Sequence, residues 1–218
     1  GDAQLSTAED KHGTSSLLLD GTGDYVSVPD HAIFSLADNF TCEMWVRWAD
    51  TPANATFAGA ATDGPTRWEF GWNATEIELK IYSSGSLIVT SAQTWSPSAT
   101  TWYHVALVRD GNDYKMFVDG TQVGSTVTDS STVPDFSGIF CIGSGPTMGL
   151  NGFIGHIDEF RWTQGQALYS ASFTPSTTAF AAPIANNSFA PSGSPTQVKD
   201  SPTDSADDGI GNYCTMNP

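Results

Sequence analysis

Short apolar segments separated by turn residues follow one another along the chain up to about residue 180. The turns, rich in Gly, Pro, Asp and Asn, recur roughly every eight to twelve residues, a spacing typical of β-sandwiches and β-barrels. No stretch of helical length shows a clear 3.6-residue period. We therefore expect an all-β fold, with strands at residues 17–19, 25–28, 40–48, 57–60, 68–72, 77–82, 87–90, 102–109, 114–118, 122–123, 139–142 and 153–162.

The segment 40–48 shows the clearest alternation. Side chains at every second position share one face of a strand, and here one face is almost wholly apolar while the other is mixed. We expect the apolar face to point into a core. Its members are Phe40, Cys42, Met44, Val46 and Trp48, and those of the other face are Thr41, Glu43, Trp45 and Arg47.

The segment 102–109 is apolar on both faces, which is typical of a strand in the middle of a sheet. The turn sequence Asp110-Gly111-Asn112 leads from it into the strand 114–118, and Asp119-Gly120 forms a second turn. The sequence thus predicts a three-stranded meander between residues 102 and 123.

The charge balance excludes several functions. The chain has 8 Lys and Arg against 24 Asp and Glu, a formal net charge of -16. Such a chain lacks the basic surface that nucleic acids and anionic membranes require. No apolar run reaches the roughly 18 to 20 residues needed to cross a bilayer. The sequence begins with Gly1-Asp2, without an initiator Met or a signal-peptide pattern, so we expect it to be processed or cut from a longer chain.

The last 38 residues differ from the rest. Residues 181–218 are rich in Pro, Ser, Asp and Asn and cannot form a core of their own. We therefore divide the chain into a domain at 1–180 and a tail at 181–218, which is either a linker or an extended arm lying on a neighbouring subunit. The three cysteines, Cys42, Cys141 and Cys214, are too few and too far apart for a disulfide framework, and they do not indicate a redox compartment.

Five blocks of the sequence resemble, in order and spacing, the laminin-G-like, concanavalin A-like jelly roll: residues 16–26, 40–46, 102–111, 117–120 and 153–161. The resemblance implies a sandwich of two antiparallel sheets with a concave face, a fold found in lectins, pentraxins, laminin modules and some glycanases. A narrower likeness lies in residues 157–162, 167–169 and 173–175, which resemble the version of this domain on tail, fibre and decoration proteins of bacteriophages.

Catalytic motifs are not evident. Laminarinase-type glycanases place three carboxylates on one strand, and the nearest run here supplies Glu76 and Glu78 without the third. The four histidines are scattered, and neither a Gly-x-Ser-x-Gly elbow nor a Cys-x-x-Cys pair occurs. We expect the protein not to be an enzyme.

A metal site is a stronger candidate. The loop that contains Asp20 and Asp24 offers carboxylates and carbonyls of the kind that Ca²⁺ prefers. In the family resembled, a structural Ca²⁺ often joins this loop to the last long strand, which implies Asp158 as a further ligand. The alternative is that Asp20 and Asp24 only shape a turn and that Asp158 accepts backbone hydrogen bonds.

A sugar site is also predicted. Trp68 and Trp72 share one face of a strand and Asn73 follows them, and aromatic rings stack on sugar rings while amides bind hydroxyls. The alternative is that these aromatic side chains belong to the sandwich core.

With no catalytic motif evident, the resemblance implies a non-enzymatic virion surface protein, a decoration, fibre or tail module with a lectin-like domain that could bind host-surface glycans. Its expected partners are other virion proteins or identical subunits, which the arm would join by strand addition. We expect neither nucleic acid binding nor membrane insertion. The alternatives are a secreted or cell-surface lectin, which would be extracellular, and a glycanase with unrecognised carboxylates.

Overall fold

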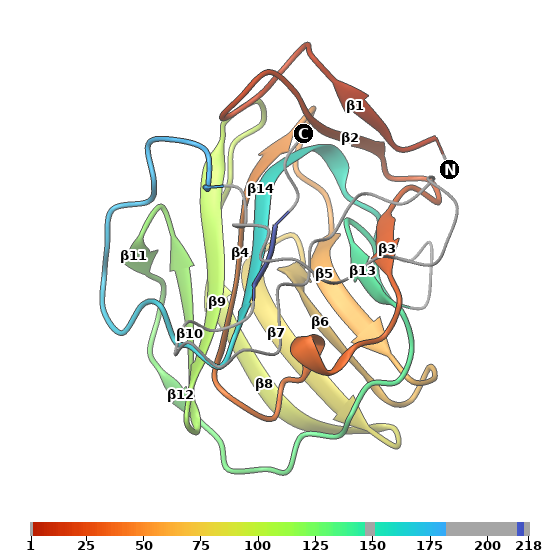
Figure 1. Ribbon diagram of the computed structural model, residues 1–218, viewed down its shortest axis with the longest axis vertical. Helices are drawn as coiled ribbons and strands as arrows, with labels where there is room; N and C mark the ends of the chain where they lie inside the picture. The colour runs from red at the N-terminus through yellow and green to blue at the C-terminus, as the bar shows by residue number, and fades with distance from the viewer. Residues whose placement is uncertain (1, 147–150, 182–212, 216–218) are drawn as a thin grey trace.

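Two antiparallel β-sheets face each other in the computed structural model, which describes residues 2–146, 151–181 and 213–215 (Figure 1). The predicted jelly-roll sandwich is therefore confirmed. The larger sheet has the order β1-β2-β14-β4-β9-β10-β11, with β12 paired to β10 and β15 to β14. Its strands are β1 (Gln4–Ser6), β2 (Ser16–Asp20), β4 (Phe40–Trp48), β9 (Tyr103–Asp110), β10 (Asp113–Val118), β11 (Thr121–Gln122), β12 (Val127–Thr128), β14 (Ile154–Gln164) and β15 (Tyr213–Thr215).

The smaller sheet has the order β3-β13-β5-β6-β7-β8. Its strands are β3 (Val26–Val28), β5 (Ala55–Ala61), β6 (Arg67–Trp72), β7 (Glu76–Ser83), β8 (Ser86–Thr94) and β13 (Phe140–Ile142). A 3-10 turn, η1 (Ala32–Phe34), leads towards β4. No helix in the described part of the chain has the length and apolar character needed to cross a membrane.

Each predicted strand has a counterpart, within a few residues at its ends. The meander is present as β9, β10 and β11, and β9 lies between β4 and β10 as expected of a strand that is apolar on both faces. The strands β1, β12 and β15 and the turn η1 were not predicted, because segments of two or three residues carry too little periodicity to be recognised.

The main core fills the space between the sheets. The predicted apolar face of β4 is wholly buried there, and Trp162 of β14 stacks on Phe40 with 4.8 Å between ring centroids. The smaller sheet contributes Phe57, Trp68 and Phe70. Each large apolar side chain buried in this way contributes about 1.5 to 3 kcal/mol to the free energy of folding.

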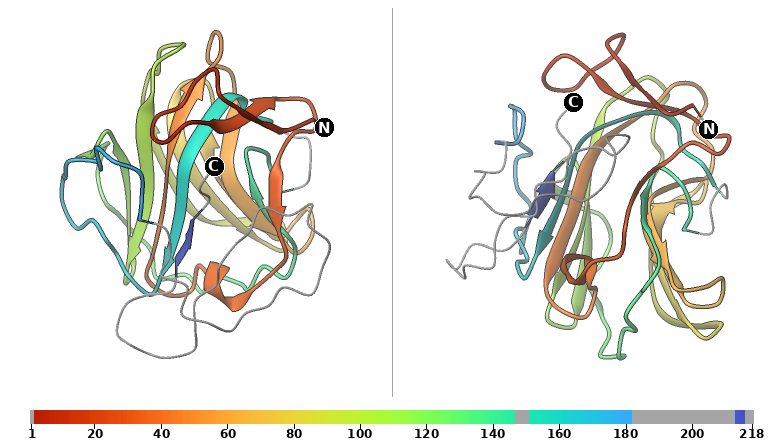
Figure 2. Two further views of the ribbon diagram at one scale, coloured as in Figure 1. Left: turned by 45° about the horizontal axis from the view of Figure 1, so that its top comes forward. Right: turned by 45° about the vertical axis from the view of Figure 1, so that its right-hand side comes forward.

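A second, smaller cluster lies on the outer face of the larger sheet, the face turned away from the smaller sheet. There Ala106, Val108 and Phe117 pack against Tyr169 and Phe173 of the segment that follows β14. This segment runs alongside the sheet in the right-hand view of Figure 2. The second cluster explains why the sequence of β9 is apolar on both faces.

The tail predicted at 181–218 lies mostly outside the described residues. Its described strand β15 pairs antiparallel with β14 of the same chain, with Trp162 opposite Cys214. Pairing of the arm with a neighbouring subunit stays a prediction. Cys42 and Cys141 are buried and free, and burial raises the pKa of both thiols, that of Cys141 to about 11.

Candidate functional site

A cleft of about 520 Å³ opens on the outer face of the larger sheet. Three parts of the chain form it: the segment before β2, the sheet itself with its adjoining turns, and the segment after β14. The lining residues are Lys11, His12, Trp45, Trp102, Asp119, Pro175, Ser176 and Thr177.

Trp45 forms the floor of the cleft. Its register partners are His104 on β9 and Asp158 on β14, so the three side chains stand in one row across the sheet. The indole ring makes edge contacts with His104 and His12, with ring centroids 5.3 and 5.9 Å apart. The Lys11 ammonium lies over the ring at 3.9 Å from its centroid. Trp45 is the large apolar residue on the mixed face of residues 40–48, and that signal could have identified it.

Asp158 holds the N-terminal wall in place. Its carboxylate accepts hydrogen bonds from the backbone N–H groups of Lys11 at 2.8 Å and His12 at 3.1 Å, and a third from Glu159 at 2.9 Å. Burial raises the pKa of Asp158, and these backbone donors only partly offset the effect. Asp158 is thus a positioning residue for the cleft.

A buried charge cluster lies in the next row of the sheet. Glu43 accepts hydrogen bonds from Arg161 at 2.7 Å and from the Tyr169 hydroxyl at 2.8 Å. It forms a third hydrogen bond with His104 at 3.1 Å. Burial raises the pKa of Glu43, but the hydrogen bond from His104 and the charge of Arg161 outweigh burial and hold it below its usual value. Burial and the nearby Glu43 charge raise the pKa of Tyr169. The cluster ties β4, β9 and β14 to the C-terminal segment.

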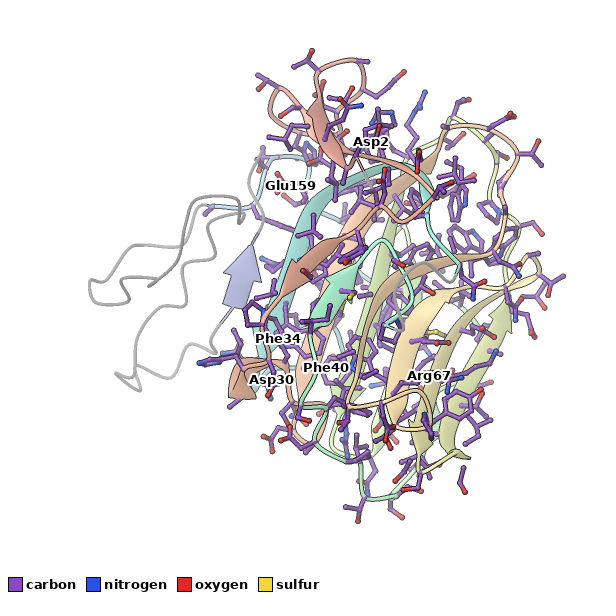
Figure 3. All side chains as sticks on the ribbon, turned by 90° about the vertical axis from the view of Figure 1, so that its right-hand side faces the viewer. Asp2, Asp30, Phe34, Phe40, Arg67 and Glu159 are labelled. Carbon is purple, nitrogen blue, oxygen red and sulfur yellow. The ribbon has the colours of Figure 1, made fainter. Side chains whose placement is uncertain are left out.

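The C-terminal wall is anchored at the turn after β10. The Phe173 N–H donates to the Gly120 carbonyl at 2.8 Å, and the Phe173 ring makes an edge contact with His104. Gly120 has φ +75, and a Cβ atom there would collide with the Phe173 carbonyl. Asp119 accepts a hydrogen bond from the His104 N–H at 2.9 Å, which fixes its carboxylate at the cleft. Glu159, which follows Asp158 on β14 and is labelled in Figure 3, accepts a hydrogen bond from the Phe180 N–H.

The cleft therefore combines an aromatic floor, a half-buried tryptophan at Trp102, an ammonium group, a carboxylate and the hydroxyls of Ser176 and Thr177. Polar and charged groups beside aromatic surfaces suit a small polar ligand such as a sugar. Sequence reasoning missed Lys11, Trp102 and the C-terminal wall, since only the fold brings these distant segments together.

The predicted sugar residues lie elsewhere, and the structure corrects that expectation. Trp68 is 0% exposed and Trp72 is 7% exposed, so neither ring offers a face on which a sugar could stack. Both belong to the sandwich core, which was the alternative to a sugar site for aromatic side chains on one face of a strand. The Trp72 indole N–H donates to the Trp95 carbonyl at 3.0 Å. Asn73 is half-buried and donates to Glu78 at 2.7 Å, on the smaller sheet.

The predicted metal ligands are only partly together. Asp20 and Asp24 lie with Asp2, their carboxylate oxygens within 4.8 Å of one another, near the N-terminal strands (Figure 3). Asp24 accepts hydrogen bonds from the backbone N–H groups of Asp2 and Asp20 at 2.6 and 2.9 Å. Three carboxylates suit Ca²⁺ chemically, and the ion stays a prediction.

Asp158 is not part of this cluster. Asp20 pairs with Ile154, and Asp158 lies four residues farther along β14, about 13 Å away at the rise of a strand. Its carboxylate accepts backbone hydrogen bonds, which is the alternative to a ligand role.

Solved structures with the same architecture are known. Domain 4 of AbnA, a GH43 extracellular arabinanase from Geobacillus stearothermophilus in complex with arabinotriose, has a TM-score of 0.56 and 19% identity, covering 76% of each chain. The Ruminococcus gnavus IT-sialidase CBM40 bound to α2,3-sialyllactose has a TM-score of 0.52 and 14% identity, covering 67% of this chain and 92% of that one. Botulinum neurotoxin type C, described as interacting with two ganglioside molecules, has a TM-score of 0.57 and 15% identity, covering 78% and 42%.

No curated protein matches the sequence. A family model does, over residues 20–171, which is well over half of the chain. That span contains both sheets except for β1, part of β2 and β15. By sequence and by fold, the chain belongs to the concanavalin A-like lectin/glucanases superfamily.

Proposed function

We propose that this protein is a non-enzymatic glycan-binding module and that the cleft over Trp45 is its sugar site. The observation that carries the proposal is the cleft itself, in which Trp45 and Trp102 meet an ammonium, a carboxylate and two hydroxyls. The molecules named with the similar structures are the sugars arabinotriose and sialyllactose and the glycolipids called gangliosides, and they support the same class of ligand.

The carboxylates around the cleft favour binding over hydrolysis. Most glycoside hydrolases use two carboxyl groups on opposite sides of the scissile bond. Among the described residues that line the cleft, Asp119 alone carries a carboxylate. Glu43 lies beneath the surface, and its lowered pKa makes it a poor proton donor. Asp158 is committed to backbone donors.

Glycan-array binding of the recombinant chain tests this function. Trp102→Ala should weaken the best-bound glycan at least about tenfold, because the variant loses an aromatic contact surface in the cleft. The matched control is Tyr82→Ala, which removes a half-buried aromatic ring from the smaller sheet. Binding that survives Trp102→Ala would place the sugar site elsewhere, and a chain that binds no glycan would refute the function.

We further propose that the module is displayed on a virion surface, as part of a tail, fibre or decoration protein, with virion proteins or identical subunits as partners. The likeness of residues 157–175 to bacteriophage structural proteins supports this proposal. Antibodies raised against the recombinant chain should label the surface of purified phage particles in immunogold electron microscopy. Labelling of a cell surface or recovery from the culture medium alone would favour the alternative, an extracellular lectin.

A further inference from the structure

We propose that the cleft selects a sugar residue that carries an anionic group, a carboxylate or a sulfate ester, and that Lys11 binds this group. The inference rests on the proposed function and specifies its ligand class. It follows from the charged residues that line the cleft and from the position of the Lys11 ammonium.

The Lys11 ammonium has no carboxylate partner among the described residues. Most other cations of the described chain are already neutralised or engaged. The ion pairs are Arg47–Glu9, Arg67–Glu69, Lys80–Glu78 and Arg161–Glu43, and Arg109 donates to the carbonyls of Leu36 and Gly111. The chain has a net charge of -16, so an ammonium at a cleft without a carboxylate partner among the described residues marks a place where an anion could bind.

The position of Lys11 is organised before a ligand arrives. Asp158 holds the backbone N–H groups of Lys11 and His12, and the Trp45 ring holds the ammonium at 3.9 Å. An ordered cation loses less conformational freedom on binding than a free surface lysine does. Because Lys11 covers the face of Trp45, the half-buried Trp102 is the aromatic surface left for the sugar ring.

Carboxylates and sulfates carry several acceptor oxygens on one group, and these match the three N–H donors of the Lys11 ammonium.

Asp119 provides a negative charge on the side of the cleft away from Lys11. Its carboxylate can accept hydrogen bonds from sugar hydroxyls, as carboxylates do in many sugar sites. An anionic group would therefore bind at the Lys11 side, away from Asp119. A sugar with one anionic substituent and free hydroxyls fits both sides of the cleft.

Isothermal titration calorimetry on the full chain tests the inference with three probes at low and high salt: sialyllactose, lactose 6′-sulfate and unsubstituted lactose. We expect at least one anionic probe to bind about tenfold or more tightly than lactose, with an affinity that falls as salt rises. Lys11→Gln should remove this preference. Lys115→Gln is the matched control. Lys115 has no ion pair with any described residue and lies on β10 opposite Val108, four residues along β9 from His104.

The two anionic probes distinguish a carboxylate ligand from a sulfate ligand. Equal binding of lactose and both anionic probes, or a preference that survives Lys11→Gln, would overturn the inference and leave the glycan function standing. A chain that binds none of the three probes and no glycan on the array would refute both.

Discussion

Replacing Glu43 by Gln tests whether the buried charge cluster stabilises the outer face of the larger sheet. The Glu43 side chain is fully buried, and its partner Arg161 is 24% exposed. Glutamine has nearly the same shape and can still accept a hydrogen bond from Tyr169, so the variant chiefly loses the negative charge that Arg161 and His104 face. Breaking a buried ion pair costs about 3 to 5 kcal/mol. Because water still reaches Arg161, we expect a smaller loss than this range, about 2 to 3 kcal/mol.

Urea unfolding, followed by tryptophan fluorescence, measures this loss. At a typical slope of about 2 kcal/mol per molar urea, the midpoint should fall by about 1 M or slightly more. The control is Glu78→Gln, which removes the carboxylate from the partly exposed pair with Lys80 and should cost no more than about 1 kcal/mol. Equal midpoints for the two variants would refute the view that Glu43 holds β4, β9, β14 and the C-terminal segment together.

The same cluster predicts a pH dependence. Since the pKa of Glu43 is lower in the folded chain than in the unfolded one, the ionised side chain contributes stability above its unfolded value, near 4.3. That contribution is lost as the pH falls through the folded pKa. Asp158 has the opposite sign, because burial raises its pKa and its charged form costs stability as the pH rises. The difference between wild type and Glu43→Gln should therefore shrink below about pH 4, and a constant difference down to pH 3 would contradict the assignment.

Three further outcomes are expected. Asp158→Asn should weaken glycan binding several-fold and speed hydrogen exchange at the backbone amides of residues 11 and 12, because the Asn side chain accepts their hydrogen bonds less strongly than a carboxylate does. Unchanged exchange would contradict the positioning role of Asp158. Excess Ca²⁺ should raise the Tm, by the equivalent of about 2.7 kcal/mol at a hundredfold excess over the Kd, and Asp20→Asn should abolish the rise; a Tm indifferent to both Ca²⁺ and EDTA would exclude the predicted ion. Gly120→Ala should lower the Tm more than Gly111→Ala. Both glycines have a positive φ, but of the two only Gly120 would place the added Cβ against another part of the chain, the Phe173 carbonyl. Equal losses of Tm would show that backbone strain alone causes the destabilisation.

The local pattern of the sequence was enough to predict the longer strands, and for two of them how their faces are buried. Period-two alternation placed one face of residues 40–48 in the core, and a doubly apolar strand at residues 102–109 required cover on both sides. These predictions hold because each depends on neighbours only a few residues apart, and a strand puts alternate side chains on opposite faces wherever it lies.

The site depended on contacts that no local pattern encodes. Alternation could not say whether Trp68 and Trp72 face a core or a ligand, because apolar side chains serve both. Asp158 was a ligand candidate by its place in the chain, and its actual partners, the amides of Lys11 and His12, are 147 and 146 residues away. Sheet register alone places Trp45 between His104 and Asp158. The sequence determined which side chains lie on each face of each strand, and only the tertiary structure decided which faces meet, because the cleft forms where three segments distant in the chain pack onto one sheet.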